Sequence, residues 1–374
     1  MTNNKFNFLL DLRLLLNVEG IGPGKIFSLL SKLDSFENIL SSSINNLLNV
    51  PGISKNLASR IQMVNKQRAE LAASFETEIA ELEKLTGSII TYWDDNYPKL
   101  LRRIYYPPLM IQTLGEFTEK DQFAIAVVGT RMPTAYGKMQ AEKISSALAE
   151  QNITIVSGLA RGIDSIAHKA ALKVNGRTIS VIGSGLDVIY PPENKKLFHQ
   201  IAEQGLIISE FPLGTKPDAQ NFPKRNRIIA GISLGTVVVE TKHTGGAMQT
   251  AAHALDQNRE VFAVPGNLGV AQSEGTNSLI QKGEAKLIKS HEDILVELEL
   301  KLKPIIGKNI PKPSVELSLF EQKVLETISD SPLHIDNIAS SVSMNTSECL
   351  VHLLSLEFKG MVRQLPGKMF LASV

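Results

Sequence analysis

Residues 153–164 read Ile153-Thr154-Ile155-Val156-Ser157-Gly158-Leu159-Ala160-Arg161-Gly162-Ile163-Asp164. The first four residues are all β-branched, and a turn with two glycines follows them directly. Such a short β-branched run predicts a strand that is buried on both faces, as in a parallel sheet. We therefore expect a strand over Ile153–Val156 that leads through a glycine turn into a helix.

Similar runs occur along residues 120–300 and predict the other strands of one sheet. We expect these strands at Ile125–Val128, Thr178–Ile182, Ile207–Ser209, Thr236–Val239, Glu260–Val264 and Lys286–Ile288. Helical segments of about 10–15 residues separate the runs, which is the spacing of βαβ units. The predicted fold class is therefore α/β, with a Rossmann-like, doubly wound and mostly parallel sheet.

A repeat marks the N-terminal part of the chain. The segment Leu15-Leu16-Asn17-Val18-Glu19-Gly20-Ile21 recurs thirty-two residues later as Leu47-Leu48-Asn49-Val50-Pro51-Gly52-Ile53. Each copy leads through a glycine hairpin into a second helix, so the region resembles tandem helix-hairpin-helix motifs. The backbone N–H groups at such a helix start can hold a phosphate. The pair can equally be a packing unit, and Ser54 replaces the second glycine of the later copy.

The chain is predicted to have four parts. Residues 1–88 form a helical domain with the two hairpins and a helix over residues 66–88. Residues 89–300 form the Rossmann-like domain, which begins with a proline-containing strap. Residues 301–316 are a linker with Pro and Lys, and residues 317–374 follow the order helix, helix, helix, hairpin, which is typical of a winged helix.

The composition narrows the class of protein. Lys and Arg number 39 against 38 Asp and Glu, so a nucleic-acid surface would have to be a local patch. Cys349 is the one cysteine, which excludes an intrachain disulfide and a cysteine-based metal site. We see no signal peptide and no apolar run of membrane-spanning length, and we expect a cytoplasmic protein.

Glycines and small polar residues gather where the predicted strands end. Because ligands bind beyond the carboxyl ends of parallel strands, these turns predict an anion-binding edge with backbone N–H donors. The candidate binding residues in these turns are Gly129, Arg131, Ser157, Gly158, Arg161, Gly162, Gly183, Gly185, Gly245 and Gly246.

The stretch Asn221–Gly231 adds cations to this edge. It holds three cations, two amide side chains and one aromatic ring within seven residues, followed by an apolar run that predicts a helix. Guanidinium and ammonium groups suit phosphate oxygens, and a ring offers a stacking surface for a base. The alternative is a solvated helix start. The candidate binding residues here are Asn221, Phe222, Lys224, Arg225, Asn226 and Arg227.

The sequence gives little support for a site that binds a nucleotide cofactor or a metal. The turn after Val128 lacks the G-x-G-x-x-G spacing of a dinucleotide site, and no G-x-x-x-x-G-K-[ST] motif for ATP occurs. No His or carboxylate cluster suggests a metal site. We therefore expect no cofactor and no metal, and we interpret His168 as an ordinary helix residue.

Five motifs together resemble the DNA-processing protein DprA (Smf) family. They are Ser157–His168, Gly185–Pro191, Ser209–Pro212, Asn221–Gly231 and Arg259–Asn267. The resemblance implies a single-stranded DNA-binding homodimer that protects incoming DNA and loads RecA recombinase in natural transformation. It implies DNA contacts for Arg131, Lys224, Arg225 and Arg227, with the glycine turns as backbone donors.

Two alternatives remain open. The fold and Pro265-Gly266-Asn267 distantly resemble nucleotide-processing phosphoribohydrolases, but Asn267 interrupts their signature and Glu274 is displaced from its place. A transcription factor acting through the winged helix would need Arg and Lys for major-groove readout, and residues 346–359 offer only Lys359. We expect no enzymatic activity.

Overall fold

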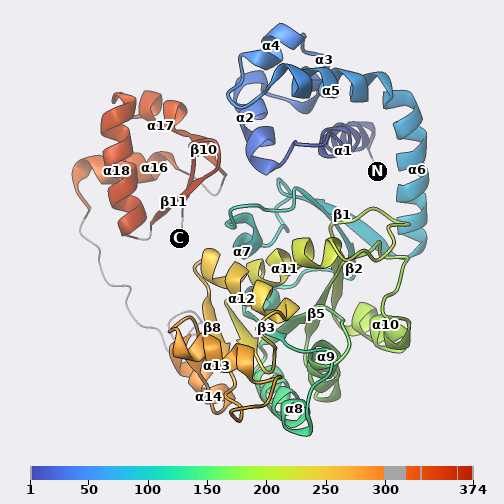
Figure 1. The fold of residues 1–374 in the computed structure, drawn as a ribbon. Helices are drawn as coiled ribbons and strands as arrows, with labels where there is room; N and C mark the ends of the chain where they lie inside the picture. Colours follow the sequence, from blue (N-terminus) through green and yellow to red (C-terminus); the bar gives the residue numbers. More distant parts are fainter. Residues whose placement is uncertain (1, 299–316, 329–330, 360, 373–374) are drawn as a thin grey trace. The chain divides into compact units, whose positions relative to one another are not determined.

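The computed structural model describes residues 2–298, 317–328, 331–359 and 361–372 (Figure 1). The predicted linker over residues 301–316 lies outside the described residues. The described residues fall into two compact units. One unit contains the residues up to Ile79 together with those from 317 onward, and the other runs from Ala80 to 298.

The second unit is built on one mixed sheet, in which nine strands are described. In spatial order the strands are β1, β2, β6, β5, β4, β3, β7, β8 and β9. The seven from β6 to β9 are parallel, and all seven predicted strands are confirmed. Their bounds are β3 (Ala124–Val128), β4 (Thr154–Ser157), β5 (Thr178–Ile182), β6 (Leu206–Ser209), β7 (Gly235–Val238), β8 (Glu260–Ala263) and β9 (Lys286–Leu287).

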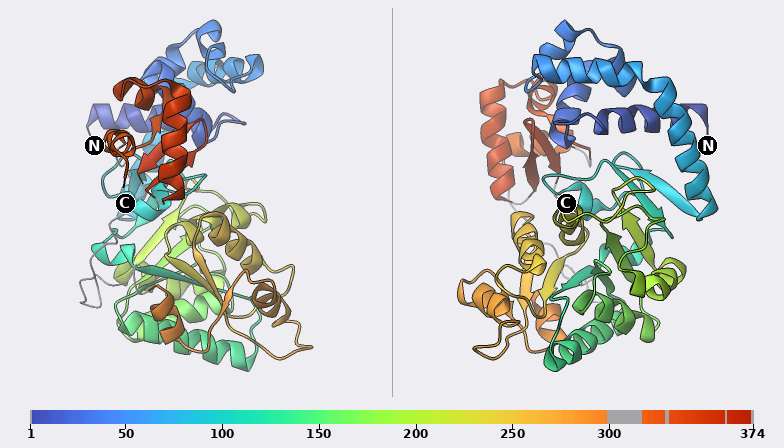
Figure 2. Two further views of the ribbon diagram at one scale, coloured as in Figure 1. Left: turned by 90° about the vertical axis from the view of Figure 1, so that its left-hand side faces the viewer. Right: turned by 45° about the vertical axis from the view of Figure 1, so that its right-hand side comes forward.

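Helices cover both faces of this sheet, as the doubly wound prediction requires (Figures 1 and 2). One face carries α8 (Ala135–Glu150), α9 (Ile163–Lys173), α10 (Lys195–Gln204) and α14 (His291–Glu297). The other face carries α11 (Asn221–Gly231) and α12 (Gly246–Asp256). Shorter elements are α7 (Lys99–Arg102), α13 (Glu274–Gln281), η1 (Glu119–Gln122) and η2 (Pro192–Asn194).

The strap before the parallel strands differs from its prediction. It contains β1 (Gly87–Thr91) and β2 (Met110–Leu114), which pair antiparallel and join the sheet through β6. The preceding helix α6 (Arg68–Lys84) ends before residue 88 because Thr86 has a left-handed φ of 57°. The prediction of one helix over residues 66–88 was therefore wrong at its C-terminal end, and the predicted strap contains two strands that the sequence pattern did not reveal.

The first unit contains the two predicted hairpins. Gly20 and Gly52 have φ of 89° and 81°, a conformation that glycine adopts at little cost. Ser54 caps its helix by accepting a hydrogen bond from the backbone N–H of Leu57, while Gly22 offers no such side chain. The helices are α1 (Asn3–Leu16), α2 (Pro23–Leu33), α3 (Phe36–Ser41), α4 (Ile44–Leu48) and α5 (Lys55–Lys66).

The C-terminal part of the first unit has the predicted winged-helix order. Its buried core includes Val324, Ile338, Leu353 and Phe370. The hairpin predicted at its end is confirmed, and a short third strand pairs with it. The elements are α16 (Leu319–Thr327), β10 (Leu333–His334), α17 (Ile335–Ser341), α18 (Thr346–Phe358), β11 (Val362–Leu365) and β12 (Met369–Ala372).

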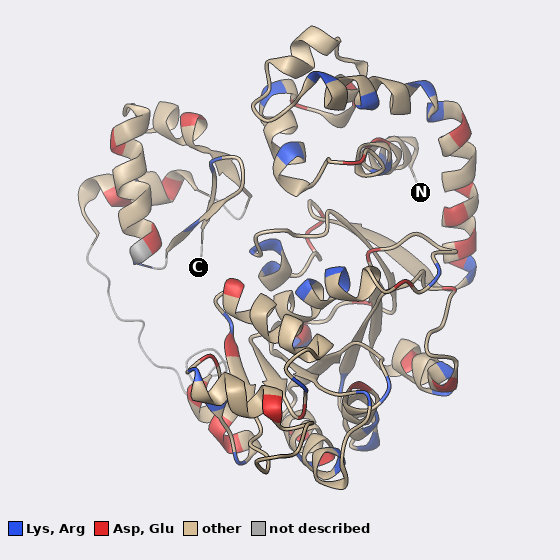
Figure 3. Ribbon diagram, in the orientation of Figure 1, with Lys and Arg blue, Asp and Glu red and all other residues tan. Residues whose placement is uncertain are grey.

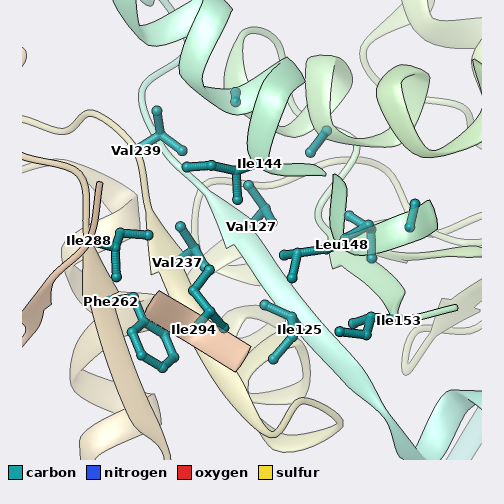
Figure 4. Packing of buried hydrophobic residues seen from close by; sticks show 14 of the residues in the cluster. Ile125, Val127, Ile144, Leu148, Ile153, Val237, Val239, Phe262, Ile288 and Ile294 are labelled. Atoms are coloured by element: carbon teal, nitrogen blue, oxygen red, sulfur yellow. The ribbon is translucent and has the colours of Figure 1, made fainter. Parts of the chain in front are cut away.

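One hydrophobic core of the second unit lies between the sheet and helices α8, α9 and α14 (Figure 4). Ile125 and Val127 of β3 meet Ile144 and Leu148 of α8, and all four side chains are buried. Packing in this core determines where the carboxyl ends of β3 and β7 lie, and so it positions the turns that follow these strands.

Truncation of Phe262 tests this core. Its ring is fully buried and packs beneath Gly235, where an added Cβ would lie 2.9 Å from the ring. We expect Phe262→Ala to lower the free energy of unfolding by about 3–5 kcal/mol, through lost burial and the cavity left behind. Urea unfolding measures this. The control Leu268→Ala, at a side chain that is 91% exposed, should change it by less than about 0.5 kcal/mol. Equal effects of the two changes would contradict the proposed core.

Candidate nucleic-acid interface

The carboxyl ends of β3 and β7 open into a hollow of about 730 Å³, which we call the central hollow. The chain order reverses between these two strands, and open α/β sheets bind ligands at such a point. Most of the lining comes from three segments: the turn after β3, the first half of α11, and the loop from β7 into α12 with its first helical turn. Ala160, Asp164, Tyr190, Pro217 and Ala219 also line it. Among the predicted residues, those that line it are Gly129, Arg131, Phe222, Arg225, Asn226, Gly245 and Gly246.

Phe222 stands at the start of α11 and is partly exposed. The guanidinium carbons of Arg131 and Arg225 lie 5.6 Å and 5.9 Å from the centre of its ring, and the Tyr190 ring lies 5.9 Å away. A Cβ on Gly183 would come within 3.0 Å of the ring. Gly183, a predicted backbone donor, therefore leaves the space in which the Phe222 ring packs. The ring is thus a fixed platform beside two cations.

Arg225 is buried beneath the hollow, with 4% of its surface exposed. Its Nη1 donates to the carbonyl oxygen of Val181, and a Cβ on Gly158 would overlap the guanidinium. Burial lowers the pKa of Arg225 to about 10, and attraction to Asp164 opposes that shift, so the side chain stays charged at neutral pH. Arg225 therefore makes the electrostatic potential of the central hollow more positive, but its side chain does not extend into the solvent to contact a ligand.

The turn between β4 and α9 holds a carboxylate of the protein itself. Asp164 is buried, and its Oδ2 accepts hydrogen bonds from the backbone N–H groups of Gly158 (3.1 Å) and Ala160 (3.4 Å). Burial raises the pKa of Asp164, and Arg225 opposes that effect. The predicted donor Ser157 is also buried and donates to the carbonyl oxygen of Val127 at 2.6 Å. These groups are therefore satisfied within the protein.

A second carboxylate fills the turn before α8. Glu240 is buried, and its oxygens accept from the Thr134 backbone N–H at 2.9 Å and the Thr134 hydroxyl at 2.6 Å. A Cβ on Gly137 would overlap the Glu240 carboxylate. A dinucleotide fold places its pyrophosphate at this first helix start. Here Glu240 occupies that position, which sequence reasoning missed because Glu240 is distant along the chain.

The start of α12 is open by comparison. Its N-cap residue Gly245 makes no side-chain cap, Gly246 is exposed, and both line the central hollow. The first N–H groups of a helix lack intrahelical partners and favour an anion. This helix start can therefore donate to a phosphate in the central hollow.

Two predicted cations are paired with carboxylates outside the central hollow. Arg227 lies 2.5 Å from Glu210 and packs over the Tyr106 ring, and both charged side chains are partly buried. Arg161 makes two hydrogen bonds to Glu193, the longer of them 3.2 Å. The other predicted residues outside the lining set are Ser157, Gly158, Gly162, Gly183, Gly185, Asn221 and Lys224.

Three exposed cations remain around the central hollow. Arg131 and Lys242 line it, and Lys224 projects from the first turn of α11. Within the described residues none of the three has an ion-pair partner. Sequence reasoning missed Lys242, although its place just after the β7 strand was a usable signal. Figure 3 shows that Lys and Arg, like Asp and Glu, occur in both units of the chain.

The described part of the chain contains neither a cluster of metal-binding side chains nor a membrane-spanning helix. It contains no group of three or more His, Cys, Asp or Glu side chains that could hold a metal ion. It also contains no helix that is both long and apolar enough to cross a membrane.

The buried side chain of His168 makes the stability of this region depend on pH. Its Nδ1 lies 2.7 Å from the Thr178 hydroxyl, which itself donates to Ile155, so Nδ1 carries the proton of the neutral ring. Burial, reinforced by Arg225, lowers the pKa of His168 to about 3. Because the unfolded value is about 6.5, the folded state binds fewer protons between these values. Stability is thus fully present above about pH 6.5 and falls as the pH drops towards 3.

We expect acidification from pH 6.5 to 5.5 to lower the free energy of unfolding by about 1 kcal/mol through this residue. Thermal melts of the wild type and His168→Gln across this pH range measure the effect. The variant should be less stable at pH 7 but should lose less stability on acidification. Parallel pH profiles for the two proteins would show that His168 does not carry the dependence.

The fold and this interface define a chain of three modules: tandem helix-hairpin-helix motifs, a Rossmann-like domain with a cation-lined hollow, and a winged helix. Residues 88–299 match the family model of DNA recombination-mediator protein A. Residues 310–368 match the DprA winged helix domain, and residues 12–64 match a SAM-like helix-hairpin-helix tandem. The chain belongs to this DprA (Smf) family.

Individual relatives agree with this assignment. The chain is 35% identical to protein Smf of Synechocystis over 94% of its own length and 95% of the relative. The X-ray structure of DprA from Streptococcus pneumoniae is similar, with a TM-score of 0.63 and 33% identity over 79% of this chain and 99% of that one. A Helicobacter pylori DprA structure, described for its unique single-stranded DNA binding mode, has a TM-score of 0.52 and 31% identity over 57% of this chain and 96% of that one.

Proposed function

We propose that this protein binds single-stranded DNA in the central hollow without acting as an enzyme. The observation that carries the proposal is the group of exposed cations, Arg131, Lys224 and Lys242, around the Phe222 ring and the open start of α12. Proteins ordinarily bind single strands with cations placed along the sugar–phosphate backbone and with an aromatic ring on which any base can stack. The Helicobacter pylori relative, described as binding single-stranded DNA, supports the same assignment.

The cellular role extends this proposal. Family membership supports a cytoplasmic homodimer that protects incoming single-stranded DNA and loads RecA recombinase during natural transformation. In the binding site we assign direct contacts to Arg131, Lys224 and Lys242, donors to the Gly245–Gly246 turn, and stacking to Phe222. Arg225 acts from beneath, since its guanidinium is buried.

The winged helix supports a single-strand rather than a duplex preference. The one lysine at the end of α18, Lys359, lies 2.7 Å and 2.8 Å from the two carboxylate oxygens of Glu321. The same helix carries Glu348 and Glu357. A helix with this charge offers poor complementarity to a major groove lined by phosphates.

The phosphoribohydrolase alternative receives less support. Its signature glutamate corresponds to the region of Glu274, which lies at the start of α13. Glu274 lines a separate small hollow with His243 and Asn267, and none of the central hollow's lining residues follows Thr250. A carboxylate placed outside the proposed phosphate site is poorly situated for catalysis there.

A direct test compares strand types. In gel shifts with labelled oligonucleotides of several sequences, we expect a clear preference for single strands and little dependence on sequence. Affinity should fall steeply as salt rises, because each phosphate contact releases counterions. Equal binding of duplex and single strand at moderate salt would refute the proposal.

A pair of arginine variants separates direct from structural roles. Arg131→Ala should weaken binding and lower the salt slope by roughly 0.7, with an unchanged melting temperature. Arg225→Ala should instead lower the free energy of unfolding by about 3–5 kcal/mol, because it leaves the buried Asp164 without its opposite charge. Thermal melts and binding curves on both variants measure this. Lys120→Ala, an exposed cation outside the central hollow, is the control. A destabilised Arg131→Ala would overturn this division of roles.

A further inference from the structure

A second hollow adjoins the first on the surface of the Rossmann-like domain. It has a volume of about 500 Å³ and shares Arg131 and Met132 with the central hollow. We call it the side hollow. It lies over the starts of α8 and α9, so a chain leaving the central hollow past Arg131 would enter it directly.

Most of the charged side chains that line the side hollow are positive. Its charged lining residues are Arg131, Lys138, Arg161, Lys169 and Glu193, four cations and one carboxylate, in a protein whose formal net charge is only +1. Lys138 and Lys169 are exposed, and neither has an ion-pair partner in the described part of the chain. A concentration of like charge that the fold leaves unpaired favours an anionic occupant.

A close contact between two backbone turns brings Arg131 and Arg161 together. Gly162 has a φ of 75°, and a Cβ there would overlap the Thr130 carbonyl oxygen. The next residue, Ile163, donates its backbone N–H to that same oxygen at 3.2 Å. The turns after β3 and β4 are thus fastened together, which sets Arg161 and Arg131 on one continuous surface.

The lining chemistry indicates which part of a strand would lie here. The side hollow contains no aromatic ring among its lining residues, in contrast to Phe222 in the central hollow. Without a stacking surface it suits the sugar–phosphate backbone rather than a base.

Glu193 works against such an occupant. Its carboxylate holds the Arg161 guanidinium through two hydrogen bonds, and each side chain is 50% exposed. A phosphate entering the side hollow must compete with this carboxylate for Arg161 and also meets its negative charge.

Resting on the proposed function, we propose that the side hollow is a second phosphate-binding section for the same DNA strand. Lys138 and Lys169 contact its phosphates, and Glu193 restrains binding by occupying Arg161. The site then has two parts: a central hollow that holds bases and phosphates, and a side hollow that is reached only by longer strands.

The test uses the full-length protein and fluorescence anisotropy with labelled oligo-dT of about 6 and about 20 nucleotides, one near the lower end of common single-strand site sizes and one beyond their upper end. For the long strand, Lys138→Gln/Lys169→Gln should lower the salt slope by roughly 1.4, because two contacts of about 0.7 each are lost. The short strand should bind this variant as it binds the wild type. Lys120→Gln/Lys282→Gln, at exposed sites outside both hollows, is the charge-matched control.

Glu193→Gln gives an effect of opposite sign. It should tighten binding of the long strand several-fold and leave the short strand unchanged. Glu142→Gln is the matched control, since Glu142 makes a comparable exposed ion pair with Lys173 outside the side hollow. Melting temperatures of all variants confirm folding.

The inference is overturned if the double lysine variant binds the long strand with the wild-type slope, or if both strand lengths are affected equally. In either case binding of the short strand, which needs only the central hollow, still tests the proposed function separately. A wild-type protein that binds neither oligonucleotide would reject the proposed function itself.

Discussion

The buried charges of Arg225 and Asp164 are the constraint on which the interface depends. Arg225 comes from α11 on one face of the sheet and Asp164 from α9 on the other, and each feels the charge of the other at the carboxyl ends of the strands. Each would cost several kcal/mol to bury alone. Their mutual attraction, with the Val181 carbonyl and two backbone N–H groups, ties both helical layers to one edge. This requirement also explains Gly158, where any side chain would displace the guanidinium.

The same chemistry determines which helix starts remain available to a ligand. Asp164 satisfies donors in the turn before α9, and Glu240 satisfies those before α8. A fold that commonly holds nucleotide phosphates at such positions has here filled two of them with its own carboxylates. The start of α12 and the surrounding exposed cations are left, and they suit an extended polyanion better than a compact cofactor.

The sequence predicted the parallel strands well because their β-branched runs are buried on both faces and leave a clear pattern. It missed β1 and β2, which flank a segment containing Pro98, Pro107 and Pro108 and are decided by pairing with each other and with β6. It singled out the segment Asn221–Gly231 but did not distinguish the environments of Lys224, Arg225 and Arg227. Those environments depend on Asp164 and Glu210, which adjoin the segment only in three dimensions.

The strand β9 closes one edge of the sheet with only two residues, Lys286 and Leu287, both exposed. An edge this short exposes few unpaired backbone groups, and its lysine discourages strand-to-strand joining of two copies. This edge of the sheet therefore resists backbone pairing with the sheet of a second copy of the chain.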